Sequence, residues 1–233
     1  KRYFSPWANG LFKDERAHIV ADDARNFLLG TNEQFDVIVG DLFTPWHAGT
    51  GSLYTLEHFE QAKKRLSPGG IFAQWLPLYQ LTSENFNTIA ATFAAVYPQV
   101  TLWRADFSTT RASIVLIGQE AGARLNENTL RRNIVHVIGK QADPGNNHMA
   151  GLFYLGNVEA IRDRLSGIEL NTDDRRSVEF KAPILSQQAY TGRTAFITGK
   201  ELDGLLTALR SNLPAEEDPY LANLPKEEIR FVK

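Results

Sequence analysis

The chain has 233 residues, of which 43% are hydrophobic and 22% charged, and this composition is ordinary for a soluble globular protein. A formal net charge of -2 excludes bulk attraction to nucleic acid or to an anionic membrane, and the lack of cysteine excludes disulfides, thiolate metal sites and a cysteine nucleophile. No apolar run approaches the length of a membrane span, so we expect a soluble domain, and the lack of cysteine fits a cytoplasmic location.

The first half of the chain alternates predicted strands with predicted helices. Apolar runs typical of strands occupy residues 17–21, 35–40, 71–78, 100–104 and 113–117. Apolar residues at helical spacing lie in residues 24–28, 56–66 and 86–97, and Pro68-Gly69-Gly70 and Pro98 provide stop signals. No helix fits between the last two strands, so we expect that pair to be antiparallel. The alternation predicts an α/β fold with a largely parallel sheet.

The pattern changes after Gln119. Helical spacing returns in residues 130–138, 158–165 and 202–209, and residues 142–147 have the composition of a loop. The segment from Pro214 onward is charged and interrupted by prolines, and we expect it to be partly mobile. We therefore predict two domains, an α/β domain over residues 1–120 and a mainly helical C-terminal extension over residues 121–233.

Asp41 is the first candidate for chemistry, because it directly follows the predicted strand at residues 35–40 and precedes a long loop rich in turn formers. A carboxylate at the C-terminal end of a parallel strand lies where open α/β sheets bind ligands. The alternative is an aspartate that turns the chain by accepting a hydrogen bond from its own backbone. The residue pattern alone favours neither of these roles.

Two further polar clusters are candidates for a site, but in both the residue pattern favours a structural role. Asp22-Asp23-Ala24 lies between a predicted strand and a helix, so Asp23 either caps the helix or accepts a hydrogen bond from a bound base, and the cap is favoured. The opposite charges in residues 171–176 are typical of a solvated turn. The five histidines are scattered, and we predict no metal site.

Four segments together resemble the spermidine synthase (aminopropyltransferase) family, which is related to the class I AdoMet-dependent methyltransferases. They are "IVADDARNFL", "FDVIVGDLFTPW", "SLYTLEHFEQAKKRLSPGGIFAQWL" and "TFAAVYPQV", and they occur in the family's order and spacing. A later segment, "LNTDDRRSVEF", resembles a motif of the bacterial branch in which this domain is fused to membrane segments. The resemblance implies a Rossmann-like, methyltransferase-type sheet, mostly parallel, with an antiparallel last strand.

The resemblance also implies roles for individual residues. Asp41 matches the family's catalytic aspartate, and Asp23 with Ala24 matches the pair that holds the adenine of decarboxylated AdoMet. The residues that match the acceptor side are Gln74 and Trp75 at a strand end and Tyr54 in the loop that closes over the cleft. Asp173 and Asp174 have no counterpart in minimal spermidine synthases, and their role stays open.

The implied activity is transfer of an alkyl group from decarboxylated AdoMet, or from AdoMet itself, to a small-molecule amine acceptor with Asp41 as base. Family members usually associate, so a homo-oligomer is expected. Two alternatives remain. One is a non-catalytic nucleoside-binding, regulatory domain of a membrane-fused protein, and the other is an AdoMet-dependent methyltransferase.

Two departures from the family pattern affect these expectations. The family's glycine-rich first strand and its second strand lie upstream of the matched segments, so we expect a sheet that lacks its first two strands. Either an upstream segment precedes these residues in a longer protein, which we favour, or the strands pair differently here. We expect the chain to be the C-terminal part of the domain, within a longer protein that has a membrane-embedded part.

The second departure concerns the acceptor. Polyamine-using members usually carry an aspartate three residues after the catalytic one, where this chain has Thr44, which makes putrescine a doubtful acceptor. Glu57 either compensates for this loss or stabilises the start of its own helix.

Overall fold

The structure is a computed structural model that describes residues 10–123, 149–224 and 226–232, together with four single positions between 129 and 136. These residues belong to two compact units, one that ends at Thr31 and one that begins at Asn32.

The smaller unit contains the 3-10 helix η1 (Leu11–Lys13) and the helix α1 (Ala24–Gly30). The helix predicted around residues 24–28 is therefore confirmed. The strand predicted at residues 17–21 is wrong, since these residues form no strand, and Ile19 and Val20 are 59% and 60% exposed. A strand needs a partner for its backbone hydrogen bonds, and none pairs with residues 17–21 among the described residues.

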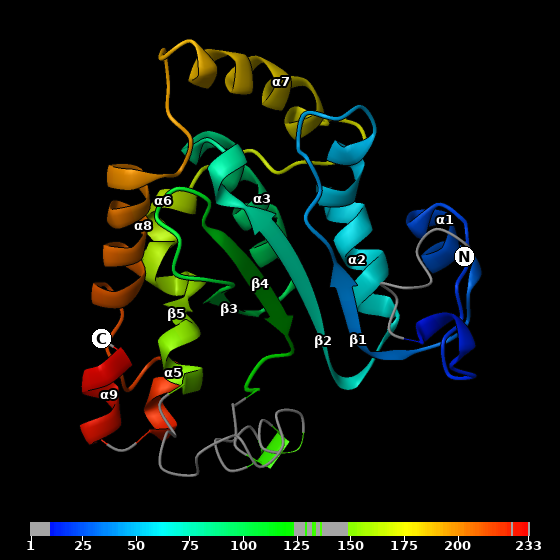
Figure 1. Ribbon diagram of the computed structural model, residues 1–233, viewed down its shortest axis with the longest axis horizontal. Helices are drawn as coiled ribbons and strands as arrows, with labels where there is room; N and C mark the ends of the chain where they lie inside the picture. Colours follow the sequence, from blue (N-terminus) through cyan, green and yellow to red (C-terminus); the bar gives the residue numbers. More distant parts are fainter. Residues whose placement is uncertain are drawn as a thin grey trace. The chain divides into compact units, whose positions relative to one another are not determined.

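The larger unit is built on a five-stranded sheet in the order β1-β2-β4-β3-β5 (Figure 1). Its strands are β1 (Phe35–Gly40), β2 (Leu66–Pro77), β3 (Gln99–Arg104), β4 (Ser113–Gln119) and β5 (Tyr154–Asn157). The α/β class and the antiparallel pairing of β3 with β4 are confirmed. The predicted excess of parallel pairing is not seen among the described strands. Of the pairs between described strands, that of β1 with β2 is parallel and the other three are antiparallel, because β4 inserts between β2 and β3 and β5 adds a further antiparallel pair.

The helices α2 (Leu56–Lys64) and α3 (Ser83–Val96) pack on the sheet through an aromatic core. Phe59 of α2, Phe72 of β2 and Phe93 of α3 are fully or almost fully buried, and their ring centroids lie 5.0 to 5.9 Å apart. The helix predicted to reach residue 66 ends at Lys64, because Leu66 already pairs with Phe35 in the sheet and the Arg65 carbonyl accepts a bond from the Phe35 N–H. The short 3-10 helices η2 (Thr50–Tyr54) and η3 (Leu78–Gln80) lie before α2 and after β2.

The residues after position 120 are mostly helical where they are described, and they also supply β5. Their helices are α5 (Met149–Phe153), η5 (Val158–Ile161), α6 (Arg162–Leu165), α7 (Ser177–Tyr190), α8 (Gly199–Ser211), η6 (Leu221–Asn223) and α9 (Lys226–Val232). The helices predicted at residues 158–165 and 202–209 are confirmed, and the helix and loop predicted between 130 and 147 lie outside the described residues. The predicted boundary at residue 120 stays a prediction.

The described residues after Pro214 differ from the expected mobile tail, because they contribute to a hydrophobic core. Tyr220, Leu221 and Leu224 are buried in a cluster with Tyr154 of β5, and Trp103 of β3 packs against this cluster. No helix in the described part of the chain is both long and apolar enough to span a membrane.

Candidate functional site

The site predicted from the sequence centres on Asp41 and on the loop that follows β1. Residues 41–55 are called the Asp41 loop below. The Asp41 side chain is exposed, and its Oδ1 accepts a hydrogen bond of 2.7 Å from the N–H of Leu42. The local backbone bond that the sequence allowed is thus present. It uses one carboxylate oxygen and leaves Oδ2 without a hydrogen-bond partner among the described residues.

Gln74 is the predicted site residue that the sheet brings beside Asp41. Gly40 and Gln74 are partners in the register of β1 and β2, and Gln74 is fully buried. Its Nε2 lies 3.4 Å from the carbonyl oxygens of Gly40 and Asp41 and 3.1 Å from that of Trp75. A Cβ atom on Gly40 would lie 2.4 Å from the Gln74 Oε1, so only glycine leaves room for this side chain. Gln74 therefore fixes the backbone that carries Asp41.

The other two residues predicted on the acceptor side are Trp75 and Tyr54, and their contacts with an acceptor stay a prediction. Side chains of successive strand residues point to opposite faces of a sheet, so Trp75 is half-buried on the face opposite Gln74. Tyr54 is fully buried, its hydroxyl donates a 3.3 Å hydrogen bond to the carbonyl of Phe43, and its ring meets the Phe43 ring edge-on at 6.2 Å. Burial raises the pKa of the Tyr54 hydroxyl. In this structure Tyr54 links the end of the Asp41 loop to Phe43 near its start.

Asp23 and Ala24 belong to the smaller unit, where Asp23 caps α1. Its Oδ1 accepts hydrogen bonds from the N–H groups of Arg25 at 2.9 Å and Asn26 at 3.0 Å, and Ala24 is the first helical residue. The cap that the spacing favoured is therefore present. Both bonds reach the same oxygen, so the cap does not occupy Oδ2. The adenine contact of Asp23 and Ala24 stays a prediction.

The contacts that the sequence analysis missed come from residues 171–179, which lie against the Asp41 loop. Glu179 accepts hydrogen bonds from the backbone N–H groups of Gly49 and Gly51. The carboxylate of Glu57, in the first turn of α2, accepts a 2.9 Å bond from the N–H of Asp173. No local pattern could indicate these contacts, since they join residues more than 100 positions apart in the sequence. The segment interpreted as a solvated turn is thus partly a packing surface for the loop.

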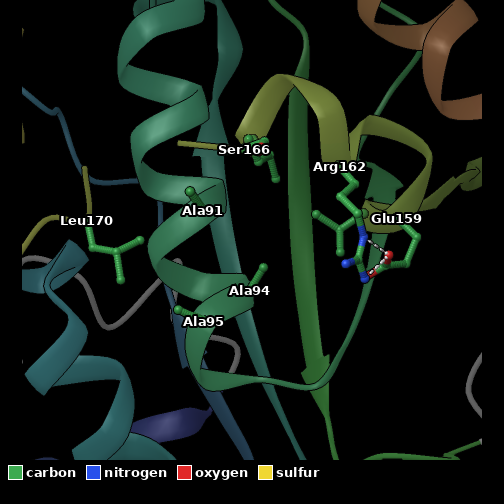
Figure 2. Close-up of a pocket in the computed structure, with 9 residues that line it drawn as sticks. Ala91, Ala94, Ala95, Glu159, Arg162, Ser166 and Leu170 are labelled. Carbon is green, nitrogen blue, oxygen red and sulfur yellow. Dashed lines mark hydrogen bonds and ion pairs between the residues drawn. The ribbon is translucent and has the colours of Figure 1, made fainter. Parts of the chain in front are cut away.

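A cavity of about 390 Å³ lies elsewhere in the larger unit, between α3 and the η5–α6 segment (Figure 2). Its α3 side consists of Ala91, Ala94 and Ala95, and across the cavity Arg162 forms an ion pair with Glu159. None of the site residues predicted from the sequence lines this cavity. Because its charged groups already pair with each other, it adds nothing to the chemistry of Asp41. Among the described residues, no group of three or more His, Asp or Glu side chains is placed to hold a metal ion.

Comparison with known proteins identifies the family. The model of the spermine/spermidine synthase domain matches residues 1–117, which is half of the chain. This match includes α1, the Asp41 loop, the strands β1 to β3 and β4 up to residue 117. The chain belongs to the spermine/spermidine synthase family.

Similar curated proteins are polyamine aminopropyltransferases. The one from Aeropyrum pernix is 35% identical over 102 residues, which cover 41% of this chain and 32% of that protein. The one from Saccharolobus solfataricus is 28% identical over 139 residues, which cover 54% of this chain and 46% of that protein. The chain thus spans less than half the length of these relatives. Among solved structures, a probable spermidine synthase from Corynebacterium glutamicum is 19% identical with a TM-score of 0.48, covering 74% of this chain and 61% of that one.

Proposed function

We propose that this chain belongs to an aminopropyltransferase-like enzyme that transfers an alkyl group to an amine, with Asp41 as the base. The observation that carries the proposal is the position of Asp41. Its carboxylate lies at the C-terminal end of β1, exposed, with one oxygen held by the Leu42 N–H and the backbone held by Gln74. Family membership and the names of the curated relatives support the same class of reaction.

The chemistry requires a carboxylate of this kind. An alkylammonium group titrates near roughly pH 10, so almost no free amine is present at neutral pH. Asp41 would orient the ammonium group and accept its proton, a contribution typically worth about a hundred- to ten-thousand-fold in rate. The amine nitrogen then forms a bond to the carbon beside the sulfonium, the carbon–sulfur bond breaks, and its electron pair stays on the sulfur of the leaving thioether. Alignment of nitrogen, carbon and sulfur supplies a further large part of the acceleration.

The proposed donor is decarboxylated AdoMet or AdoMet, as co-substrate, with Asp23 and Ala24 beside its adenine. Asp23 can serve in both roles because its helix cap uses only Oδ1. The proposed acceptor is a small amine beside Asp41, whose backbone Gln74 holds, and the acceptor contacts of Trp75 and Tyr54 are proposed from the family resemblance alone. Thr44 offers no charge to a second ammonium group, and loss of a buried charge partner weakens binding of a dication by about 2 kcal/mol or more. A monoamine therefore suits the site better than putrescine.

The remaining parts of the proposal follow from the family resemblance. We propose a homo-oligomer in the cytoplasm, tethered to a membrane-embedded part of a longer protein. No metal enters the proposed reaction, because the carboxylate accepts the proton and the sulfonium provides the leaving group.

The test measures 5′-methylthioadenosine formed by the full-length protein from decarboxylated AdoMet and a panel of amines. Asp41→Asn keeps the shape of the side chain and removes the base, so product formation should fall by about a hundred-fold or more. Glu84→Gln, an exposed change of the same kind on α3, is the control. Undiminished product formation in Asp41→Asn would remove Asp41 from the mechanism. Methylated amine formed from AdoMet in place of these products would assign the protein to methyl transfer.

A second candidate function is nucleoside binding without turnover, as a regulatory domain. Thr44 favours it, because the family's second acidic residue is replaced by a neutral one. Calorimetry distinguishes this candidate, since it predicts binding of the sulfonium nucleoside by the full-length protein without product, in the wild type and in Asp41→Asn alike.

A further inference from the structure

The Asp41 loop is held by hydrogen bonds to one distant segment, residues 171–179, which we call the anchor segment. It contains the start of α7, and Figure 1 shows α7 at the end of the sheet toward which β1 and β2 point. The anchor segment takes up most of the motif "LNTDDRRSVEF", for which the sequence analysis found no role.

Glu179 binds the loop with both carboxylate oxygens. Oε1 accepts a 2.5 Å hydrogen bond from the Gly49 N–H, and Oε2 accepts a 2.7 Å bond from the Gly51 N–H. Hydrogen bonds to a charged acceptor are roughly twice as strong as neutral ones. A single side chain on α7 thus holds two backbone groups at the middle of the loop.

Asn171 also binds the loop and is fully buried. Its Nδ2 donates a 3.1 Å bond to the Gly51 carbonyl, and its Oδ1 accepts a 3.1 Å bond from the Val178 N–H at the start of α7. Its backbone N–H donates to Thr92 of α3, and its carbonyl accepts from the N–H of Leu56 at the start of α2. Asn171 therefore joins the loop to three helices through four bonds.

Gly51 is the loop residue at which these contacts converge. Its N–H binds Glu179 and its carbonyl binds Asn171, so both of its backbone groups are paired with the anchor segment. A Cβ atom on Gly51 would lie 2.7 Å from the backbone N and Cα of Glu179. The loop and the first turn of α7 can pack this closely only because residue 51 is glycine.

We propose that Asn171 and Glu179 are positioning residues for the transfer reaction, because they fix the Asp41 loop over the acceptor side of the site. The inference rests on the proposed function in one respect, namely that the loop covers a bound amine. The physical reason is that an ordered loop excludes water and limits the orientations of the amine, whereas a loop without these bonds samples many positions.

The first test is hydrogen exchange of the Gly49 and Gly51 amides in the full-length protein. Glu179→Ala removes both acceptors, so exchange at both amides should become about ten-fold faster or more. Glu179→Gln keeps one acceptor oxygen and should accelerate one amide more than the other. Glu84→Gln, on α3, removes an exposed ion pair with Lys181, which lies on α7 as Glu179 does. This control should leave exchange at both amides unchanged. Unchanged exchange in Glu179→Ala would overturn the inference.

The second test separates positioning from a merely structural role. In Glu179→Gln and in Gly51→Ala, the KM of the amine should rise by about ten-fold, and the KM of the sulfonium donor should stay within about two-fold. Equal changes in both constants, or none, would overturn the positioning role even if exchange accelerates. Without turnover by the wild type, amine affinity measured by calorimetry takes the place of KM. If the wild type neither turns over nor binds an amine, the proposed function fails together with the positioning role. The exchange result then decides only whether Glu179 holds the loop in place.

Discussion

Replacing Tyr154 by phenylalanine should destabilise the larger unit, because it removes a hydrogen bond to a buried charge. Tyr154 is 1% exposed and Asp218 is 2% exposed. The Tyr154 hydroxyl lies 2.7 Å from both carboxylate oxygens of Asp218, whose Oδ1 also accepts 3.0 Å bonds from the N–H groups of Tyr220 and Leu221. The hydroxyl is therefore the one side-chain donor to Asp218 among the described residues.

The magnitude follows from these contacts. A hydrogen bond to a charged group contributes about 1.5–3 kcal/mol, and the carboxylate of Asp218 cannot find water at its buried position. The loss of the hydroxyl should therefore lower the free energy of unfolding by about 2–3 kcal/mol. In a unit of this size, that change corresponds to a decrease of roughly 4–12 °C in Tm.

Thermal and denaturant unfolding followed by circular dichroism provide the assay. Tyr190→Phe is the matched control, because Tyr190 is 73% exposed and its hydroxyl has no hydrogen bond among the described residues, so its change should stay within about 0.5 kcal/mol. A loss below about 0.5 kcal/mol in Tyr154→Phe would refute the reasoning and would mean that water replaces the lost hydroxyl at Asp218.

Two further predictions concern ionisation and capping. Burial raises the pKa values of Tyr54, Tyr97 and Tyr154, so the folded protein holds these protons when the unfolded chain releases them above roughly pH 10, and stability should fall as the pH rises beyond that value. An ultraviolet titration should show these tyrosines ionising only on unfolding, and early ionisation of all seven would contradict it. Asp23→Ala should destabilise α1 by about 1 kcal/mol and speed exchange of the Asn26 amide, whereas Asp23→Ser should restore this amide but not nucleoside binding. Normal nucleoside binding in Asp23→Ser would contradict the adenine contact.

The sequence predicts those elements whose signal is local. α3 was evident because its buried residues recur at helical spacing, and Pro98 follows its end. α7 was missed for the opposite reason, since Phe180, Ile184 and Tyr190 are exposed and Pro183 lies within the helix. A helix that buries few apolar side chains has no strong periodic pattern.

Pairing and long-range contacts set the limit of sequence-based prediction. Residues 17–21 have the composition of a strand, yet composition cannot supply a partner. For the candidate site, the position of Asp41 directly after β1 is confirmed and its role stays a prediction, whereas the opposite faces of Gln74 and Trp75 follow from their successive places in β2. The roles of Asn171 and Glu179 depend on packing between segments that no local pattern connects.

The dependence of Gly49 and Gly51 on Glu179 has a consequence for biosynthesis. Glu179 is 130 positions downstream of Gly49, and a ribosome adding about 5–20 residues per second needs roughly 6–26 s to reach it. During that interval the nascent chain already contains Asp41 but has no partner for these two amides. The Asp41 loop can therefore gain these hydrogen bonds only after residue 179 has been synthesised. A stop codon placed before residue 171 should release a polypeptide whose loop lacks the bonds to Asn171 and Glu179.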